Sequence, residues 1–265
     1  MRHLCSFAGK MIDFLSPKRV VRGILNPREA GRHIRKNLRQ SKAERRLANL
    51  DYEELAEQRR PELAALFDTD VDHIRQLETE LYDKTDFLEG FEHRWNTLEA
   101  DDDRVGSTSR FDAETLYLTT RLAKPSVILE TGCRYGSFDA YIIEALADNG
   151  TGELHAIDLP DEPPRGFGYL IPDDRMNYWT LHKGDVNDML TDVLDEIGPV
   201  DLFLHDSIHK RSHMRWEYKT ASKYLSENGV IASHDLMFSN AFQEFTEGPQ
   251  WKAAIVGNTG VAKSV

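Results

Sequence analysis

The residues best suited to chemistry lie in two groups, each placed where an apolar run gives way to polar residues. In the first group, VILETGCRYGSFDA, Glu130 ends an apolar run, and Gly132 and Gly136 follow it. A carboxylate beside two residues without side chains suits three roles: holding a dinucleotide pyrophosphate, holding an amino acid joined to a nucleoside, or packing a strand on a helix. The G-x-G-x-x-G pattern of a pyrophosphate site needs a third glycine, which this turn lacks.

The second group follows two later apolar runs. Asp206 and His209 lie in LFLHDSIHK, and His234 and Asp235 lie in VIASHDLMF. If the two runs form neighbouring strands, the four side chains lie at one edge of the sheet, within reach of a common point. Carboxylates and imidazoles can hold a divalent cation, and an imidazole alone can accept a proton near neutral pH. A structural role in an acidic cleft is the third alternative.

The strands and helices that would position these groups alternate beyond Arg110. The expected strands are 126–130, 153–158, 178–182, 200–205 and 229–234, and the expected helices are 112–122, 137–147, 187–197 and 211–225. Apolar strands separated by helices predict an α/β fold with a doubly wound, mainly parallel sheet. The C-terminal WKAAIVGNTGVAKSV predicts an antiparallel hairpin around Asn258-Thr259-Gly260, which brings the sheet to seven strands.

The turn after the first expected strand resembles motif I of class I S-adenosylmethionine-dependent methyltransferases, whose pattern is E/D-x-G-x-x-x-G. The resemblance covers about residues 110–265. It implies that Glu130, Gly132 and Gly136 face the methionine end of S-adenosylmethionine. An acidic turn suits that cationic ligand and would repel a pyrophosphate.

The same resemblance assigns two further strand-end acids to the cofactor. Asp158, in LHAIDLP, matches the acid that accepts hydrogen bonds from both ribose hydroxyls. Asp185, in HKGDV, matches the acid that borders the adenine, with Val186 beside it. An Asp at a strand end is often only a turn former or a helix cap, but three such features in the family's order favour cofactor binding.

The second group resembles a branch of this family that includes small-molecule and sugar O-methyltransferases and cephalosporin-hydroxylase-like proteins. The resemblance rests on YLSENGVIASHD and on the Asp-x-x-His step. It implies O-methylation of a hydroxyl on a small molecule or on a lipid-linked sugar. The alternatives are a same-fold enzyme with hydroxylase-like chemistry and a non-catalytic cofactor-binding or assembly protein.

In family members that use a metal, acids after the fourth and fifth strands hold magnesium, which by position implies Asp206, His234 and Asp235. His234 departs from this pattern, because magnesium prefers oxygen ligands and imidazole suits manganese better. Without a metal, His209 or His234 would take the proton of the acceptor hydroxyl. We therefore expect catalysis to rest on Asp206, His209 and His234, with bound magnesium or manganese as one alternative.

Charge is divided unevenly along the chain. Residues 1–46 contain 13 Lys and Arg against 3 Asp and Glu, whereas residues 47–265 contain 20 against 42. A basic arm is attracted to anionic surfaces, so residues 1–46 would either contact a membrane surface or a partner, or form a solvated helical face. The acidic remainder disfavours a nucleic-acid partner. The sequence leaves the oligomeric state open.

Composition predicts three parts. They are a helical N-terminal extension (1–98) with a helix at 71–91, a polar linker EADDDRVGSTSR (99–110), and a methyltransferase-like domain (111–265). No apolar run approaches the roughly 20 residues needed to span a bilayer, and charged residues interrupt the N-terminal apolar groups. We therefore expect a cytoplasmic protein, with any membrane contact made peripherally through the basic arm.

Overall fold

The structure, a computed structural model, describes residues 52–101 and 109–265. The predicted basic arm and most of the predicted linker lie outside the described residues. The membrane contact of the arm and the three-part division of the chain therefore stay predictions. Among the described residues, no helix combines the length and the apolar character needed to cross a membrane.

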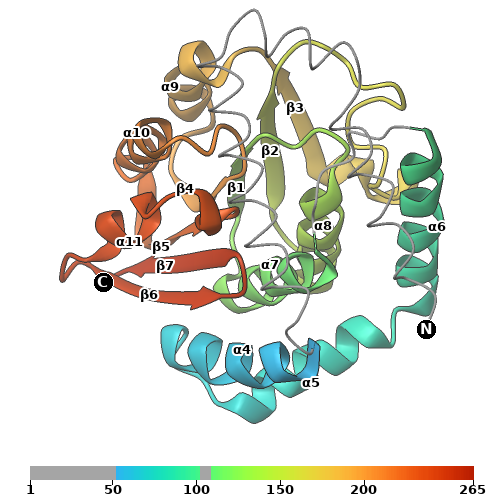
Figure 1. The fold of residues 1–265 in the computed structure, drawn as a ribbon, viewed down its shortest axis with the longest axis horizontal. Coiled ribbons are helices and arrows are strands. Elements are labelled where there is room, and N and C mark those ends of the chain that lie inside the picture. Colours follow the sequence, from blue (N-terminus) through green and yellow to red (C-terminus); the bar gives the residue numbers. More distant parts are fainter. Residues whose placement is uncertain (1–51, 102–108) are drawn as a thin grey trace, which may run out of the picture. The chain divides into compact units, whose positions relative to one another are not determined.

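A mixed sheet of seven strands runs through the described part of the chain (Figure 1). Its strands are β1 (Val127–Thr131), β2 (Glu153–Asp158), β3 (Trp179–Lys183), β4 (Val200–His205), β5 (Leu225–Ser233), β6 (Trp251–Val256) and β7 (Thr259–Ser264). The order is β3-β2-β1-β4-β5-β7-β6, in which β1 to β5 are parallel and β7 is antiparallel to β5 and β6. The predicted doubly wound sheet with a C-terminal hairpin is confirmed.

Helices cover both faces of this sheet. They are α7 (Arg110–Ala123), α8 (Ser137–Asn149), α9 (Val186–Ile197), α10 (Arg211–Ala221) and α11 (Ala241–Thr246), with the short 3₁₀ helices η2 (Asp173–Tyr178) and η3 (Leu236–Phe238). Successive strand residues point to opposite faces. Leu202 and Leu204 pack in one core with α7 and α8, whereas Phe203 packs in the other with α9 and α10. Burial on both faces explains why the strands are apolar throughout.

The direction of winding reverses at β1, which pairs with β2 on one side and β4 on the other. In open α/β sheets, ligands bind at this reversal, outside the carboxyl ends of the strands. The turns after β1, β2 and β4 therefore frame the place where a site is expected.

The strand β5 differs in detail from its prediction. It begins at Leu225 rather than Gly229, and α10 ends at Ala221, well before residue 225. Asn228 adopts a positive φ of 62°, and the register with β4 shifts at the start of the strand. A bulge of this kind breaks the apolar alternation from which strands are predicted. The hairpin turn likewise lies at Gly257-Asn258, slightly earlier than predicted.

Three helices precede the sheet: α4 (Tyr52–Leu66), α5 (Val71–Tyr82) and α6 (Thr85–Asp101). The prediction of a single helix over 71–91 is wrong, because two helices, α5 and α6, cover this segment. The backbone N–H of Asp83 donates to the carbonyls of Thr79 and Leu81 and so ends α5. Lys84 then contacts Glu144 of α8 at 2.9 Å, and α6 begins beside that helix. The helix α6 continues into the predicted linker.

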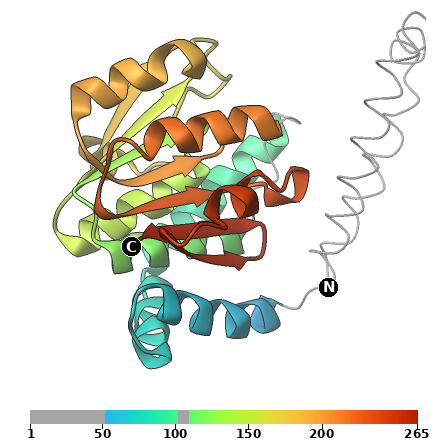
Figure 2. The same ribbon diagram turned by 90° about the vertical axis from the view of Figure 1, so that its left-hand side faces the viewer.

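A buried arginine joins these helices to the sheet domain. Arg59 of α4 is fully buried, and its guanidinium contacts Glu78 of α5 at 2.7 Å and Glu114 of α7 at 3.6 Å. The guanidinium also lies over the ring of Phe111, 4.6 Å from its centre. The same helix α4 lies beside the hairpin of β6 and β7 (Figure 2). The helices α4 and α5 are thus packed on the domain that contains the sheet.

Candidate active site

Two glycines shape the turn between β1 and α8. Gly132 has a φ of +91°, and a Cβ there would lie 2.6 Å from the backbone oxygen of Asp206. Gly136 has a φ of +75° and precedes α8, and a Cβ there would lie 3.0 Å from the Cα of Gly168. Residues with side chains rarely adopt such angles. The first glycine lets the turn close on the end of β4, and the second lets the long loop after β2 close over the start of α8.

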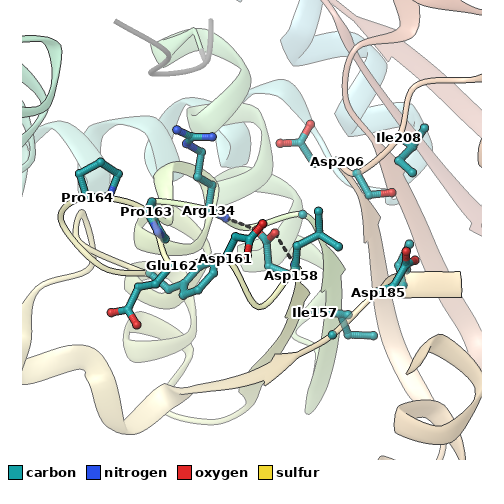
Figure 3. Close-up of a pocket in the computed structure, with 16 residues that line it drawn as sticks. Arg134, Ile157, Asp158, Asp161, Glu162, Pro163, Pro164, Asp185, Asp206 and Ile208 are labelled. Atoms are coloured by element: carbon teal, nitrogen blue, oxygen red, sulfur yellow. Dashed lines mark hydrogen bonds between the residues drawn. The ribbon is translucent and has the colours of Figure 1, made fainter. Parts of the chain in front are cut away.

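A cavity of about 500 Å³ lies beside this turn (Figure 3), a volume typical of small-molecule sites. It brings together five residues that the sequence singled out: Gly132, Asp158, Asp185, Val186 and Asp206. The other predicted site residues do not line the cavity. They are Glu130, Gly136, His209, His234 and Asp235. The long loop after β2 closes one side of the cavity with residues that include Phe167.

We expect Gly132→Ala to lower the free energy of unfolding by about 1–3 kcal/mol through backbone strain, and to weaken ligand binding in the cavity. The new Cβ would collide with the backbone that follows β4. A matched control is Gly150→Ala, whose φ of +72° carries similar strain but whose Cβ would meet no atom within 4 Å. Urea unfolding and ligand titration of both variants check this. Equal effects of the two substitutions would contradict the proposed contact.

Asp158 joins the ends of β2 and β1. Its Oδ2 accepts a hydrogen bond from the backbone N–H of Arg134 at 2.6 Å, and its Oδ1 accepts one from Leu159 at 2.7 Å (Figure 3). Asp185 is exposed and caps α9, because its Oδ1 accepts a hydrogen bond from the backbone N–H of Asn187 at 2.8 Å. Both acids have local structural partners, and both also line the cavity.

The cavity lining is strongly acidic. Five carboxylates line it: Asp158, Asp161, Glu162, Asp185 and Asp206. The basic residue of the lining is Arg134, whose guanidinium lies over the ring of Tyr135 at 5.0 Å. A lining with this charge attracts cations and repels phosphates. The cavity is therefore better matched to a cationic nucleoside ligand than to a dinucleotide.

Glu130 lies beneath the turn, almost fully buried, and is hydrogen-bonded to Asp139 of α8. Burial and the nearby charge of Asp139 raise the pKa of Glu130 well above that of a free glutamate. Burial also raises the pKa of Asp139 to about 6, although hydrogen bonds from Glu130 and Trp179 oppose the rise. The Trp179 indole N–H donates to Asp139 Oδ1 at 2.6 Å. Two neighbouring carboxyl groups therefore lie under the turn, where the sequence indicated one.

His234 lies buried between two carboxylates. Its Nδ1 is 3.0 Å from Oδ1 of Asp206, and its Nε2 is 3.7 Å from Oδ2 of Asp112 in α7. Burial opposes a charge on this ring, but the two carboxylates outweigh burial and raise the pKa of His234 well above that of free imidazole. Nδ1 of His234 therefore donates a hydrogen bond to Asp206, and the two carboxylates favour the charged form of the ring.

His209 is more accessible, with about a quarter of its side chain exposed. Its Nε2 lies 3.0 Å from Oδ2 of Asp235, and its ring stacks on Phe238 with ring centres 5.7 Å apart. The Asn258 amide donates to the other oxygen of Asp235 at 2.7 Å. The Nδ1 of His209 is screened from solvent and has no hydrogen-bond partner. Asp235 thus orients the ring and leaves one nitrogen free.

Comparison with known proteins agrees with this geometry. The family model of a methyltransferase domain, Methyltransf_24, matches residues 129–236, a segment that runs from Glu130 through Asp235. The match covers less than half of the chain, and the sheet has the class I methyltransferase fold. No match was found among curated protein sequences.

Solved methyltransferase structures share this fold at low identity. A methyltransferase from Geobacter sulfurreducens has a TM-score of 0.55 and 13% identity, covering 67% of this chain and 90% of its own. The O-methyltransferase TomG from Streptomyces achromogenes, in complex with S-adenosylmethionine, has a TM-score of 0.52 and 18% identity over 67% and 90%. The methyltransferase PaMTH1 from Podospora anserina, bound to S-adenosylhomocysteine, has a TM-score of 0.52 and 16% identity over 66% and 88%.

The structure does not support the predicted metal site. Asp206, His234 and Asp235 lie close together, but in the described ranges no group of three or more His, Cys, Asp or Glu residues is arranged to hold an ion. His234 has no free lone pair on Nδ1, because that nitrogen donates to Asp206. Asp206 and Asp235 each contact a histidine nitrogen instead, and this arrangement does not fit magnesium or manganese.

A second buried cluster supports the segment after β4. Glu217 of α10 lies 2.6 Å from Nδ1 of His205 and 2.7 Å from Nε2 of His213, and it accepts hydrogen bonds from Thr131 and Ser207. Burial alone would raise the pKa of Glu217, but His205 and these hydrogen bonds lower it to about 2. The cluster fixes Ser207, which lines the cavity beside Asp206. His205 and His213 are therefore supporting residues.

Sequence reasoning missed Asp112, Asp139 and Asn258. Asp112 lies in the first turn of an expected helix, where an acid usually serves the helix dipole. Asn258 lies in a hairpin turn, which favours Asn for its backbone angles. The acid Asp139 follows motif I in an amphipathic helix. Residue type and spacing gave no signal that these side chains point inward.

Proposed function

We propose that the protein is an S-adenosylmethionine-dependent O-methyltransferase whose acceptor is a neutral or cationic small molecule or sugar. The observation that carries the proposal is the acidic cavity in which Gly132, Asp158, Asp185 and Asp206 meet. The acid excess of the lining fits a sulfonium ligand, and it disfavours acceptors with phosphate near the reacting hydroxyl.

The cofactor would be held by residues from three turns. Asp158 keeps further lone pairs, beyond those used by Arg134 and Leu159, for ribose hydroxyls. Asp185 and the buried Val186 would border the base, and Gly132 leaves room for the methionine end. When bound, S-adenosylmethionine supplies a methyl group activated on its sulfonium.

His209 is the residue best placed to take the proton of the acceptor. Its proton on Nε2 is directed at Asp235, so the lone pair of Nδ1 is available. As the acceptor oxygen gains the methyl group, its proton would pass to this nitrogen. The acceptor must first uncover Nδ1. The two carboxylates favour the charged form of His234, so we assign it the role of holding Asp206 at the cavity rather than that of a base.

Calorimetry with S-adenosylmethionine, S-adenosylhomocysteine and NAD tests the proposal. We expect binding of the first two ligands and none of NAD. Incubation with S-adenosylmethionine carrying a ¹³C-labelled methyl group and a panel of catechols, flavonoids and sugars, read by mass spectrometry, would then identify the acceptor class. Binding of NAD without binding of S-adenosylmethionine would refute the assignment.

We expect Asp158→Ala to weaken binding of S-adenosylhomocysteine by tenfold or more, about 1.4 kcal/mol, because the ribose acceptors and the tie to Arg134 are lost together. The measurement is the dissociation constant by calorimetry. Asp188→Ala is the control, since Asp188 lies exposed in the first turn of α9, away from the cavity lining. A dissociation constant for Asp158→Ala within twofold of the parent protein would place the ribose elsewhere.

A further inference from the structure

Glu130 and Asp139 form a buried pair of acids. Glu130 ends β1 with 1% of its surface exposed, and Asp139 in the first turn of α8 has none. The two side chains are hydrogen-bonded to each other. Outside the pair, the buried Oε2 of Glu130 and Oδ2 of Asp139 have no hydrogen-bond partner. Two carboxyl groups in contact in a buried site share one proton, because both cannot be ionised.

The groups around the pair are mainly acidic. Asp158 at the end of β2 and Asp206 after β4 act on Glu130 from neighbouring strand ends, and the buried Cys133 thiol lies in the same turn. From β3, Trp179 donates its indole N–H to Asp139. Arg134 in the turn places its guanidinium over the ring of Tyr135. The negative charge around the pair therefore favours the pair in its protonated form. A bound cation would offset that negative charge and make loss of the shared proton easier.

We propose that Asp139, together with Glu130, determines how the site distinguishes the cationic cofactor from its neutral product: binding of S-adenosylmethionine expels the shared proton, whereas S-adenosylhomocysteine leaves it in place. This inference rests on the proposed function. A positive charge brought near a buried carboxyl pair favours full ionisation of the pair, and the interaction is strong where water is excluded.

The pair would then follow the charge of the ligand through the reaction. With the sulfonium present, the ionised pair carries two negative charges and attracts the methionine end of the ligand. After methyl transfer the ligand sulfur is a neutral thioether, and the pair takes up one proton from solvent. The site thereby loses one negative charge when its ligand loses one positive charge, so the product is not held by an excess of unpaired carboxylate.

Calorimetry of the full chain in buffers of different protonation enthalpy tests this inference without an acceptor. At about pH 6.5 the α-amino groups of both ligands stay protonated. The slope of binding enthalpy against buffer enthalpy gives the number of protons released. We expect S-adenosylmethionine to release about half a proton or more beyond S-adenosylhomocysteine. Glu130→Gln and Asp139→Asn should each at least halve that difference, and the double variant should abolish it.

The control variant is Asp188→Asn, which should leave the difference unchanged because Asp188 is exposed on α9. Circular dichroism confirms that each variant is folded, and the comparison of the two ligands on the parent protein stands without any variant. Binding of both ligands with equal slopes would overturn the inference alone, as would a difference that survives in the folded double variant. Absence of binding by either ligand would overturn the proposed function and the inference with it.

Discussion

Replacing Arg59 with alanine is expected to lower the free energy of unfolding by about 3–5 kcal/mol, the usual cost of removing one partner from a buried ion pair. Arg59 is fully buried between Glu78 and Glu114, so its loss removes the buried counter-ion that they share and leaves only Arg60 on Glu78 and the exposed Arg110 on Glu114. The substitution also removes the contact with the ring of Phe111. Urea unfolding followed by circular dichroism measures the change.

The matched control is Arg75→Ala. About half of the Arg75 side chain is exposed, and its partners Asp72 and Glu57 lie at 3.1 and 3.8 Å near the surface. Exposed pairs of this kind contribute about 1 kcal/mol or less. If Arg59→Ala cost no more than Arg75→Ala, the buried cluster would not be holding α4 and α5 on the sheet domain.

The strand-end acids could be predicted because the fold class determines where they go. One apolar run of strand length ends at Asp158, and Asp185 follows the next such run. Parallel strands present their carboxyl ends at one edge of the sheet, so both acids are expected there. Once the alternation of strands and helices was recognised, convergence of these acids on one cavity followed, and the structure places both there. The glycines of the turn were predictable for the same reason, although Gly132 is required by the closeness of Asp206.

Other parts of the site depend on tertiary contacts that no local pattern records. Asp112 reaches His234 only because α7 packs against the hairpin, where Thr259 and the backbone of Asn258 donate to its other oxygen. The raised pKa of His234 follows from two carboxylates brought together from α7 and the end of β4. A pattern of residue types gives the position of a histidine but not the groups that surround it. The described residues therefore give the metal prediction no support.

Substitution of His209 by glutamine is expected to reduce kcat by about 10²- to 10⁴-fold, the usual contribution of a general base. Glutamine preserves much of the side-chain volume and can still donate a hydrogen bond to Asp235, but its amide cannot accept the proton of the acceptor. Because His209 does not line the cavity, the dissociation constant for S-adenosylhomocysteine should stay within twofold of the parent value. Single-turnover rates with the acceptor found in the labelling screen measure the first quantity, and calorimetry measures the second.

The control for this substitution is His93→Gln, at an exposed position of α6, which should leave both quantities unchanged. Asp235→Asn separates orientation of the ring from proton transfer. It keeps His209 but removes the carboxylate that holds Nε2 at 3.0 Å, so we expect a smaller loss of kcat than in His209→Gln, with cofactor affinity again unchanged. If His209→Gln retained the parent rate while Asp206→Asn lost it, the proton would leave the acceptor through Asp206, and the dyad of His209 and Asp235 would have only a structural role.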